Sequence, residues 1–263
     1  MRYADWPMFA FRRRDVLSQS GEQWGRSGMR LLTVAAHPDD ETLGAGGTMA
    51  WHASRGDTVW ACVLADGASS RHGRVEQQAE CARNAADVLG LDRLVLVGLP
   101  DQRLDTLSLL DVITPIEQVI EELQPDVVLT HFPGDVNEDH RLVARATLVA
   151  TRPVPGTSVR RVCAFQIPSS TDWAPPIPGS VFAPNLFVDI SETLETKLRA
   201  MKAYAETFVS EVRPFPHPRS IEALTAYAQG HGAASGLLAA EPFMILRESA
   251  TAGMRGPWGG DVT

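Results

Sequence analysis

Short apolar runs alternate with longer amphipathic segments along the first 150 residues of the chain. The apolar runs, which predict buried strands, cover residues 29–36, 58–65, 93–97 and 126–130. The amphipathic segments, which predict helices, cover residues 42–55, 75–89, 107–123 and 139–151. Strands that alternate with helices indicate βαβ units, so the pattern predicts an α/β fold with a mainly parallel sheet and helices on both faces.

The pattern becomes irregular in the C-terminal third. Strands are expected at residues 161–167, 186–190 and 243–246, the last at an edge of the sheet. Helices should run from Ser191 to about residue 208 and from Ser220 to about Gly230. Residues 169–184 and 211–219 are proline-rich loops. We expect one domain over residues 29–250. Residues 1–28 are expected to be an N-terminal extension, either disordered or an artefact of start-site choice, and residues 251–263 a flexible tail.

Two polar clusters follow predicted strands. The first strand leads into "HPDDETLGAGG", from His37 to Gly47, and the fourth is followed by "HFPGDVNEDHR", from His131 to Arg141. Open α/β sheets bind ligands beyond the carboxyl ends of their strands, so both clusters belong to one edge. One histidine and one aspartate from the first cluster, with one histidine from the second, would leave zinc an open position for water. A spare carboxylate beside the ligands would serve as the base.

The spacing in the first cluster favours distinct roles for its acids. His37 and Asp40 are three residues apart across a turn into a helix, so both can face one point, whereas Asp39 projects differently and can lie near the water. Glu41 is expected to start the helix, where negative charge suits the dipole. Helix capping or a solvated turn would explain an acid-rich strand end without any metal.

The glycines after these acids suggest another kind of site. "GAGG" resembles part of a dinucleotide fingerprint, but G-x-G-x-x-G is not matched, and the carboxylates would repel a pyrophosphate. We therefore expect these glycines to permit close packing of the helix on the sheet.

Composition excludes several classes of partner. The 263 residues carry a formal net charge of -8, which argues against nucleic acid or anionic membrane as the main partner. Cys62, Cys81 and Cys163 suggest neither a disulfide framework nor a thiolate metal site, so each is expected to pack as a small apolar residue. No apolar run reaches the length of a membrane span, and the N-terminus is a poor signal peptide, so a cytoplasmic protein is expected.

The motifs "AHPDDETLGAGGT" and "HFPGDVNEDHR" resemble those of the LmbE-like, or PIG-L, family of zinc-dependent N-acetylglucosaminyl deacetylases. The resemblance covers roughly residues 29–247. It implies a Rossmann-like α/β fold, one bound zinc ion, with Fe²⁺ as the other metal that this ligand set accepts, and removal of acetyl from an N-acetylated amino sugar or glycoconjugate. Some members cleave related amides.

Carried over to this chain, the resemblance implies that His37, Asp40 and His140 bind the metal. Asp39 would be the general base as zinc-bound water attacks the amide. The family's second motif is often H-x-x-H, and Asn137 stands here at the position of its first histidine. Asn137 could donate a hydrogen bond to the oxyanion, but it cannot act as a protonated acid, so His217 becomes a candidate to protonate the leaving amine.

Further residues are candidates for binding the substrate or supporting the site. Arg219 could bind an anionic substrate group, and Arg74 and Asp101 lie in strand-end loops that could hold the sugar. Asp139 either orients His140 or caps the following helix. His131 either lines the site or is structural.

Other functions stay open at this point. They are an amidase for a thiol conjugate or another non-sugar amide, a non-catalytic metal- or sugar-binding protein, and a nucleotide-binding module. The loop at residues 169–184 could pack against a neighbouring chain in a homo-oligomer.

Overall fold

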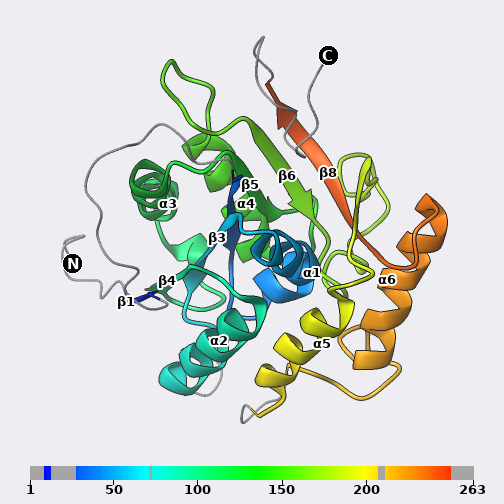
Figure 1. The fold of residues 1–263 in the computed structure, drawn as a ribbon. Helices are drawn as coiled ribbons and strands as arrows, with labels where there is room; N and C mark the ends of the chain where they lie inside the picture. The colour runs from blue at the N-terminus through cyan, green and yellow to red at the C-terminus, as the bar shows by residue number, and fades with distance from the viewer. Residues whose placement is uncertain (1–8, 13–27, 71–72, 207–210, 250–263) are drawn as a thin grey trace.

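The computed structural model describes residues 9–12, 28–70, 73–206 and 211–249, which form one mixed sheet with helices around it (Figure 1). The eight described strands lie in the order β1-β4-β3-β2-β5-β6-β8-β7. Their bounds are β1 Phe9–Arg12, β2 Arg30–Ala35, β3 Thr58–Ala65, β4 Arg93–Leu99, β5 Val127–His131, β6 Arg161–Phe165, β7 Leu186–Asp189 and β8 Ala240–Glu248. The five strands from β4 to β6 are mutually parallel, whereas β1 pairs antiparallel with β4, and β8 with both β6 and β7. The predicted α/β fold with a mainly parallel sheet is confirmed.

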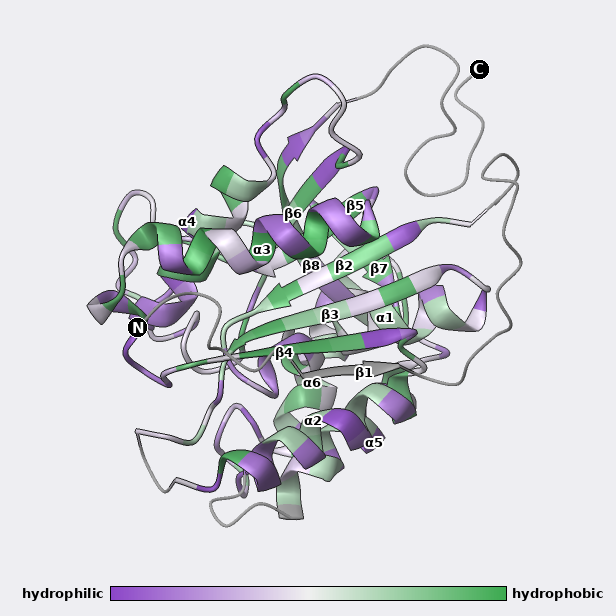
Figure 2. Ribbon diagram, turned by 90° about the vertical axis from the view of Figure 1, so that its left-hand side faces the viewer, coloured by the Kyte–Doolittle hydropathy of each residue, from purple (hydrophilic) through white to green (hydrophobic). Residues whose placement is uncertain are grey.

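Helices cover both faces of this sheet (Figure 2). They are α1 Asp40–Ser54, α2 Val75–Leu89, α3 Leu109–Leu123, α4 Glu138–Ala150, α5 Leu194–Lys202 and α6 Ile221–Ser235, with short 3₁₀ helices η2 Leu104–Thr106 and η3 Ala203–Glu206. Apolar residues of α1, α2 and α5 share one core cluster, and those of α3 and α4 share the other. The two clusters lie on opposite faces, because alternate residues of β3 enter them: Val59 and Ala61 the first, Trp60 and Cys62 the second.

The C-terminal third departs from the predicted boundaries. Helix α5 begins after Thr193, because the Ser191 hydroxyl instead bonds Asp189. It ends at Lys202, short of the predicted end near residue 208, and the chain continues as η3 to Glu206, beyond which residues 207–210 lie outside the described ranges. Helix α6 is capped by Ser220 as predicted but continues through Gly230 to a left-handed C-cap at Gly236. Strand β8 is longer than predicted and is paired on both sides, so it is not an edge strand; β7 takes that position.

The N-terminal segment contributes to the sheet. Within residues 1–28, for which no element is predicted, Phe9–Arg12 forms β1 alongside β4. Residues 1–8 and 13–27, and the expected tail at 251–263, lie outside the described residues. Within the described ranges, no helix has both the length and the apolar character needed to cross a membrane.

Glycines let α1 lie close to the sheet, as the sequence predicts. A Cβ atom at Gly44 would sit 2.3 Å from Cδ2 of the buried Phe165 in β6, and one at Gly47 would sit 2.8 Å from Ile190. A buried ion pair adds to this contact: Lys197 Nζ donates to the Leu43 carbonyl and to Glu241. The C-terminal third therefore holds the helix whose first residue is Asp40.

Candidate metal centre and active site

The two polar motifs lie at the carboxyl ends of β2 and β5, where the chain leaves these neighbouring strands in opposite directions. Strands β2 and β5 are parallel neighbours, but the chain leaves β2 through α1 toward β3 and leaves β5 through α4 toward β6 on the other side. Helices α1 and α4 lie on opposite faces of the sheet and begin beyond the carboxyl ends of these strands. Such a switch point opens a crevice, which is the usual ligand site of open α/β sheets.

The first motif forms a tight turn between β2 and α1. Strand β2 ends at Ala35, and Asp40 is the first residue of the helix. The His37 amide donates to Asp40 Oδ2 at 3.0 Å, and the ring nitrogen Nδ1 of His37 lies 3.1 Å from the same oxygen. The predicted convergence of His37 and Asp40 on one point is thus present in the backbone geometry.

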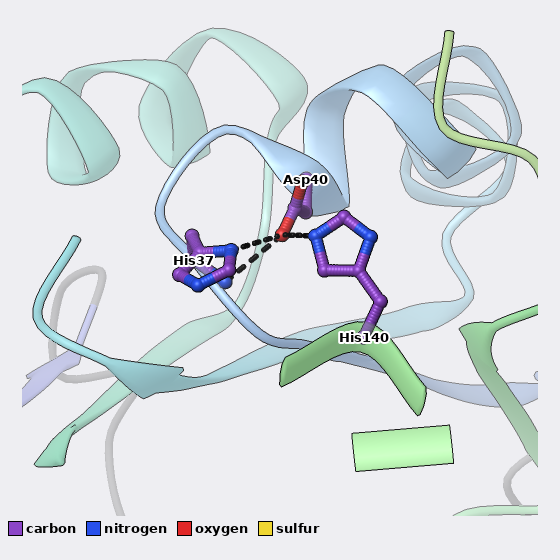
Figure 3. Close-up of side chains that lie close together, drawn as sticks. All are labelled: His37, Asp40 and His140. Carbon is purple, nitrogen blue, oxygen red and sulfur yellow. Dashed lines mark hydrogen bonds and ion pairs between the residues drawn. The ribbon is translucent and has the colours of Figure 1, made fainter. Parts of the chain in front are cut away.

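The second motif places His140 opposite them. Asn137 is the N-cap of α4, because its side-chain oxygen accepts from the Asp139 amide at 2.9 Å. This start puts His140 in the first turn, with Nε2 3.2 Å from Asp40 Oδ2. One nitrogen of each histidine and a carboxylate oxygen of Asp40 all lie within 4.8 Å of one another, and all three residues are buried (Figure 3).

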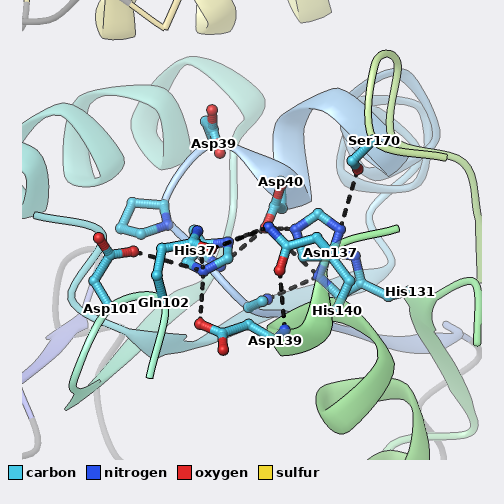
Figure 4. Close-up of polar contacts among 12 residues, drawn as sticks. His37, Asp39, Asp40, Asp101, Gln102, His131, Asn137, Asp139, His140 and Ser170 are labelled. Atoms are coloured by element: carbon cyan, nitrogen blue, oxygen red, sulfur yellow. Dashed lines mark hydrogen bonds and ion pairs between the residues drawn. The ribbon is translucent and has the colours of Figure 1, made fainter. Parts of the chain in front are cut away.

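A carboxylate contacts the outer ring nitrogen of each of these two histidines; Figure 4 shows the one at His37, which is Asp139. Nε2 of His37 lies 3.0 Å from Asp139, and Nδ1 of His140 lies 3.3 Å from Asp135. These contacts leave Nδ1 of His37 and Nε2 of His140 facing Asp40, which is how carboxylates orient histidine ligands around a metal.

The role expected for Asp139 therefore needs correction. Asp139 neither orients His140 nor caps α4: its Oδ2 contacts His37, and its Oδ1 accepts from the Leu104 amide at 3.1 Å. The physical reason is the N-cap at Asn137, which turns Asp139 toward β2 and leaves His140 to Asp135.

The charges of the cluster suit a cation. Burial opposes a charge on His37, but hydrogen bonds to Asp139 and Asp40 outweigh it and raise its pKa to about 10. Burial acts to raise the pKa of Asp40, yet the nearby imidazoles, His140 foremost, hold it well below its usual range. Among the described residues, the buried atoms Asp40 Oδ1 and His140 Nε2 have no hydrogen-bond partner. Carboxylate and imidazole donors with unused lone pairs in a buried cluster fit a divalent metal ion.

The side chain of Asp39 makes different contacts from that of Asp40. It occupies the N-cap position of α1 but makes no side-chain capping bond, and its φ of 117° is rare outside glycine. Its Oδ2 accepts instead from Arg219 at 2.8 Å, and the same guanidinium nitrogen donates to Glu211. Burial raises the pKa of Asp39 well above its usual range, with Arg219 opposing the rise and the Asp40 carboxylate adding to it.

A small polar pocket opens beside the cluster. Residues from four strand ends, from α2 and from the segment before α6 line it: His37, Pro38, Asp39, Gly67, Gln78, Asp101, Gln102, Asn137, Glu211 and Arg219. Asp101 is buried 3.6 Å from His37 Nε2. The Gln102 amide nitrogen lies 3.1 Å from the same ring atom, and the Asn137 amide lies 3.5 Å from Gln102 Oε1.

Three expected residues lie outside both this pocket lining and the cluster of His37, Asp40, His140 and Asp139. His217 accepts from the Arg219 amide through Nδ1 and turns its ring edge-on to Trp173, with 5.9 Å between ring centroids. Arg74 is exposed at the start of α2. His131 is fully buried behind His140, where it stacks at a centroid distance of 4.0 Å and accepts from the Ala36 amide.

Sequence reasoning assigned no role to three residues of this region. Asp135 lies inside the second motif, just beyond the end of β5, and its partner Ser170 comes from a proline-rich loop. Gln102 directly follows Asp101, a candidate in the same strand-end loop, so its neighbour marked the position. Glu211 follows the motifs by 70 residues or more, and no spacing signal connects it to Asp39.

Comparison with known proteins supplies independent evidence. The PIG-L family, described as "GlcNAc-PI de-N-acetylase", matches residues 32–151. The relative named "Uncharacterized deacetylase YaiS" from Escherichia coli is 32% identical over 180 residues, which are 66% of this chain and 89% of that protein. The diacetylchitobiose deacetylase of Thermococcus kodakarensis is 26% identical over 225 residues, 79% of this chain and 82% of that enzyme.

A solved structure extends the likeness to the fold. The crystal structure of the conserved protein TT1542 from Thermus thermophilus aligns with a TM-score of 0.67 and 28% identity. The alignment covers 87% of this chain and 100% of the other. The likeness of fold therefore extends over most of the chain.

Proposed function

The chain belongs to the PIG-L family, and from that membership we propose that it is a metal-dependent N-deacetylase acting on an N-acetylated amino sugar or sugar conjugate. The observation that carries the proposal is the buried cluster of His37, Asp40 and His140 with the Asp39 carboxylate beside it. The diacetylchitobiose deacetylase among its relatives supports a sugar substrate.

His37, Asp40 and His140 would hold the metal. The donor set of two imidazoles and one carboxylate suits zinc in a catalytic site, and Fe²⁺ is the alternative that the same set accepts. When bound, the ion supplies Lewis acidity, which lowers the pKa of water and polarises a carbonyl group. The carboxylates of Asp139 and Asp135 would keep both histidines aimed at it.

Asp39 would take the proton of the attacking water. Its carboxylate lines the pocket, is not used as a helix cap and is not one of the three candidate ligands. The positive charges of a bound metal ion and of the Arg219 guanidinium would favour the ionised Asp39 carboxylate, which is the form that a base requires.

The side-chain amide of Asn137 would donate a hydrogen bond to the oxyanion that forms when water attacks. Asn137 lines the pocket, and its oxygen caps α4; one of its two amide N–H groups donates to Gln102, which leaves the other for an oxyanion. A fixed donor of this kind stabilises charge that develops in the transition state. Since Asn137 carries no titratable proton, we assign return of the proton to the leaving amine to Asp39, with His217 as the second candidate.

The pocket lining supports two of the three substrate contacts. Asp101 and Arg219 face the pocket and could receive sugar hydroxyls or an anionic group, respectively. Arg74 lies at the exposed start of α2 and would reach only a larger conjugate. A cytoplasmic location and a homo-oligomer stay predictions from the sequence.

The test is release of a primary amine from N-acetylglucosamine and N,N'-diacetylchitobiose by protein of known metal content. We expect about one zinc or iron ion per chain and turnover that His140→Ala abolishes together with the metal. Asp39→Asn should keep the metal and lose turnover by about 100-fold or more, the lower end of general-base effects. Asp105→Asn, the same change at an exposed residue outside the pocket, is the control.

Two outcomes would contradict the proposal. A folded protein that takes up no zinc or iron would show that the chain is not a metal-dependent hydrolase. A metal-loaded protein that cleaves thiol-conjugate or other non-sugar amides in place of both sugars would favour the amidase on the same site.

A further inference from the structure

The backbone of Asp39 is held by a buried hydrogen-bonded pair. Its amide donates to Glu41 Oε2 at 3.1 Å, so the carboxylate two residues ahead reaches back across the first turn of α1. Glu41 Oε1 accepts from the Tyr204 hydroxyl at 2.7 Å and from the Thr42 hydroxyl at 2.8 Å. Glu41 is 2% exposed and Tyr204 is fully buried.

The side chain of Asp39 is held from the same region. Arg219 donates to Asp39 Oδ2 at 2.8 Å and to Glu211 at 3.2 Å. The Glu211 amide in turn donates to the Tyr204 carbonyl at 3.2 Å. Two chains of hydrogen bonds thus run from Asp39 to Tyr204, one through the helix start and one through Arg219.

These two chains of hydrogen bonds are more than α1 needs in order to begin. Glu41 lies in the first turn of α1, where its charge suits the helix dipole as predicted, but its carboxylate is also buried and accepts from the Asp39 amide, the Tyr204 phenol and the Thr42 hydroxyl. Phenylalanine would fill the space of Tyr204 without burying a hydroxyl, and a residue at φ 117° persists only when its surroundings over-determine that conformation. Strained, over-determined backbone is typical of functional positions.

We propose that Tyr204 and Glu41 are positioning residues, which fix the Asp39 peptide so that its carboxylate stays at the pocket beside the metal ligands. The inference rests on the proposed function, in which Asp39 is the base. Neither residue lines the pocket, so their effect passes through Asp39 and not through the substrate.

Tyr204→Phe tests the proposal because it removes one oxygen atom. Displacing a reacting group by a fraction of an ångström to one ångström costs up to about 100-fold in rate, so we expect kcat to fall by about 10-fold or more. KM should change by less than about 2-fold, because no pocket contact is lost. The metal content should stay at one ion per chain.

Tyr227→Phe is the matched control. It makes the same chemical change at a tyrosine whose hydroxyl donates to Asp172 at 2.7 Å, outside the pocket. Its kcat should equal that of the unaltered enzyme. Glu41→Gln is the second variant: it keeps the shape, but its one amide oxygen can stand in for Oε1 or Oε2 and not for both, so either the Asp39 amide or the Tyr204 O–H loses its acceptor and kcat should fall at least as far.

The outcomes separate this inference from the proposed function. If Asp39→Asn keeps full turnover, the base is wrong and the positioning role falls with it. If Asp39→Asn abolishes turnover while Tyr204→Phe keeps its kcat, only the positioning role is overturned. It is also overturned if Tyr204→Phe loses metal or raises KM at constant kcat, since a general loosening of the fold would do either.

Discussion

Two adjacent aspartates illustrate how surroundings assign roles to identical side chains. Asp40 faces His37, His140 and, at 3.6 Å, His131, so its carboxylate is held in the charged form that a metal requires. Asp39 faces carboxylates and one arginine and keeps a raised pKa. Pairs of carboxylates whose environments separate their pKa values are typical of acid–base sites, with one structural and one reactive member.

At the same scale, Asp135 is predicted to control metal affinity through His140. Asp135→Asn removes the charge that faces Nδ1 of His140 at 3.3 Å, so metal binding should weaken by about 10- to 100-fold. Titration against a competing chelator measures this constant, with the exposed Asp105→Asn as control. Equal affinities in the two variants would show that the orientation of His140 does not depend on Asp135.

His217 provides a second prediction for a single residue. Its ring turns toward Trp173 and its Nδ1 accepts from a backbone amide, so His217→Gln should keep turnover within about 2- to 3-fold, well short of the loss for a general acid. The pH profile of kcat should keep both of its limbs. Loss of the alkaline limb in this variant would instead make His217 the acid that protonates the amine.

At the scale of elements, the sequence predicts the strands and helices that pack in and against the central sheet. The bounds of β3 and α2 match the prediction, because an uninterrupted apolar run and a helix closed by Gly90 at φ 81° are strong local signals. Strand β8 was underestimated because Pro242 and Glu241 break its apolar pattern; Pro242 is tolerated because only β7 pairs there. Glu241 is satisfied by Lys197 and by amides of α1, which no local pattern reveals.

Packing of α1 on β6 gives a prediction for an element. Gly44→Ala would force a methyl group to within 2.3 Å of Phe165, so the free energy of unfolding should fall by about 1–3 kcal/mol. Gly230→Ala is the matched control inside α6: nothing lies within 4 Å of its added Cβ, and alanine favours helices, so stability should rise by about 0.5–1 kcal/mol. Urea unfolding measures both, and a neutral Gly44→Ala would mean that α1 and β6 can move apart without cost.

At the scale of the whole molecule, the site depends on contacts between distant segments. His37 and Asp139 are 102 residues apart, and Asp39 and Arg219 are 180 residues apart. Spacing and strand ends mark the two motifs in the sequence, and the resemblance to the PIG-L family implies His37, Asp40 and His140 as the candidate metal ligands. Glu211 and Tyr204 could not be predicted, since their roles exist only after the C-terminal third has folded against α1.

This dependence predicts that the metal stabilises the entire fold. The ligands join α1 on one face of the sheet to α4 on the other, and an unfolded chain has no preformed site. Metal at 100 times its dissociation constant should add about 2.7 kcal/mol, which corresponds to a rise in Tm of roughly 5–10 °C for a domain of this size. Thermal unfolding of chelator-treated protein, before and after zinc is restored, measures the shift. His140→Ala should unfold at one temperature under both conditions, and an equal rise in that variant would place the stabilising metal at a different site.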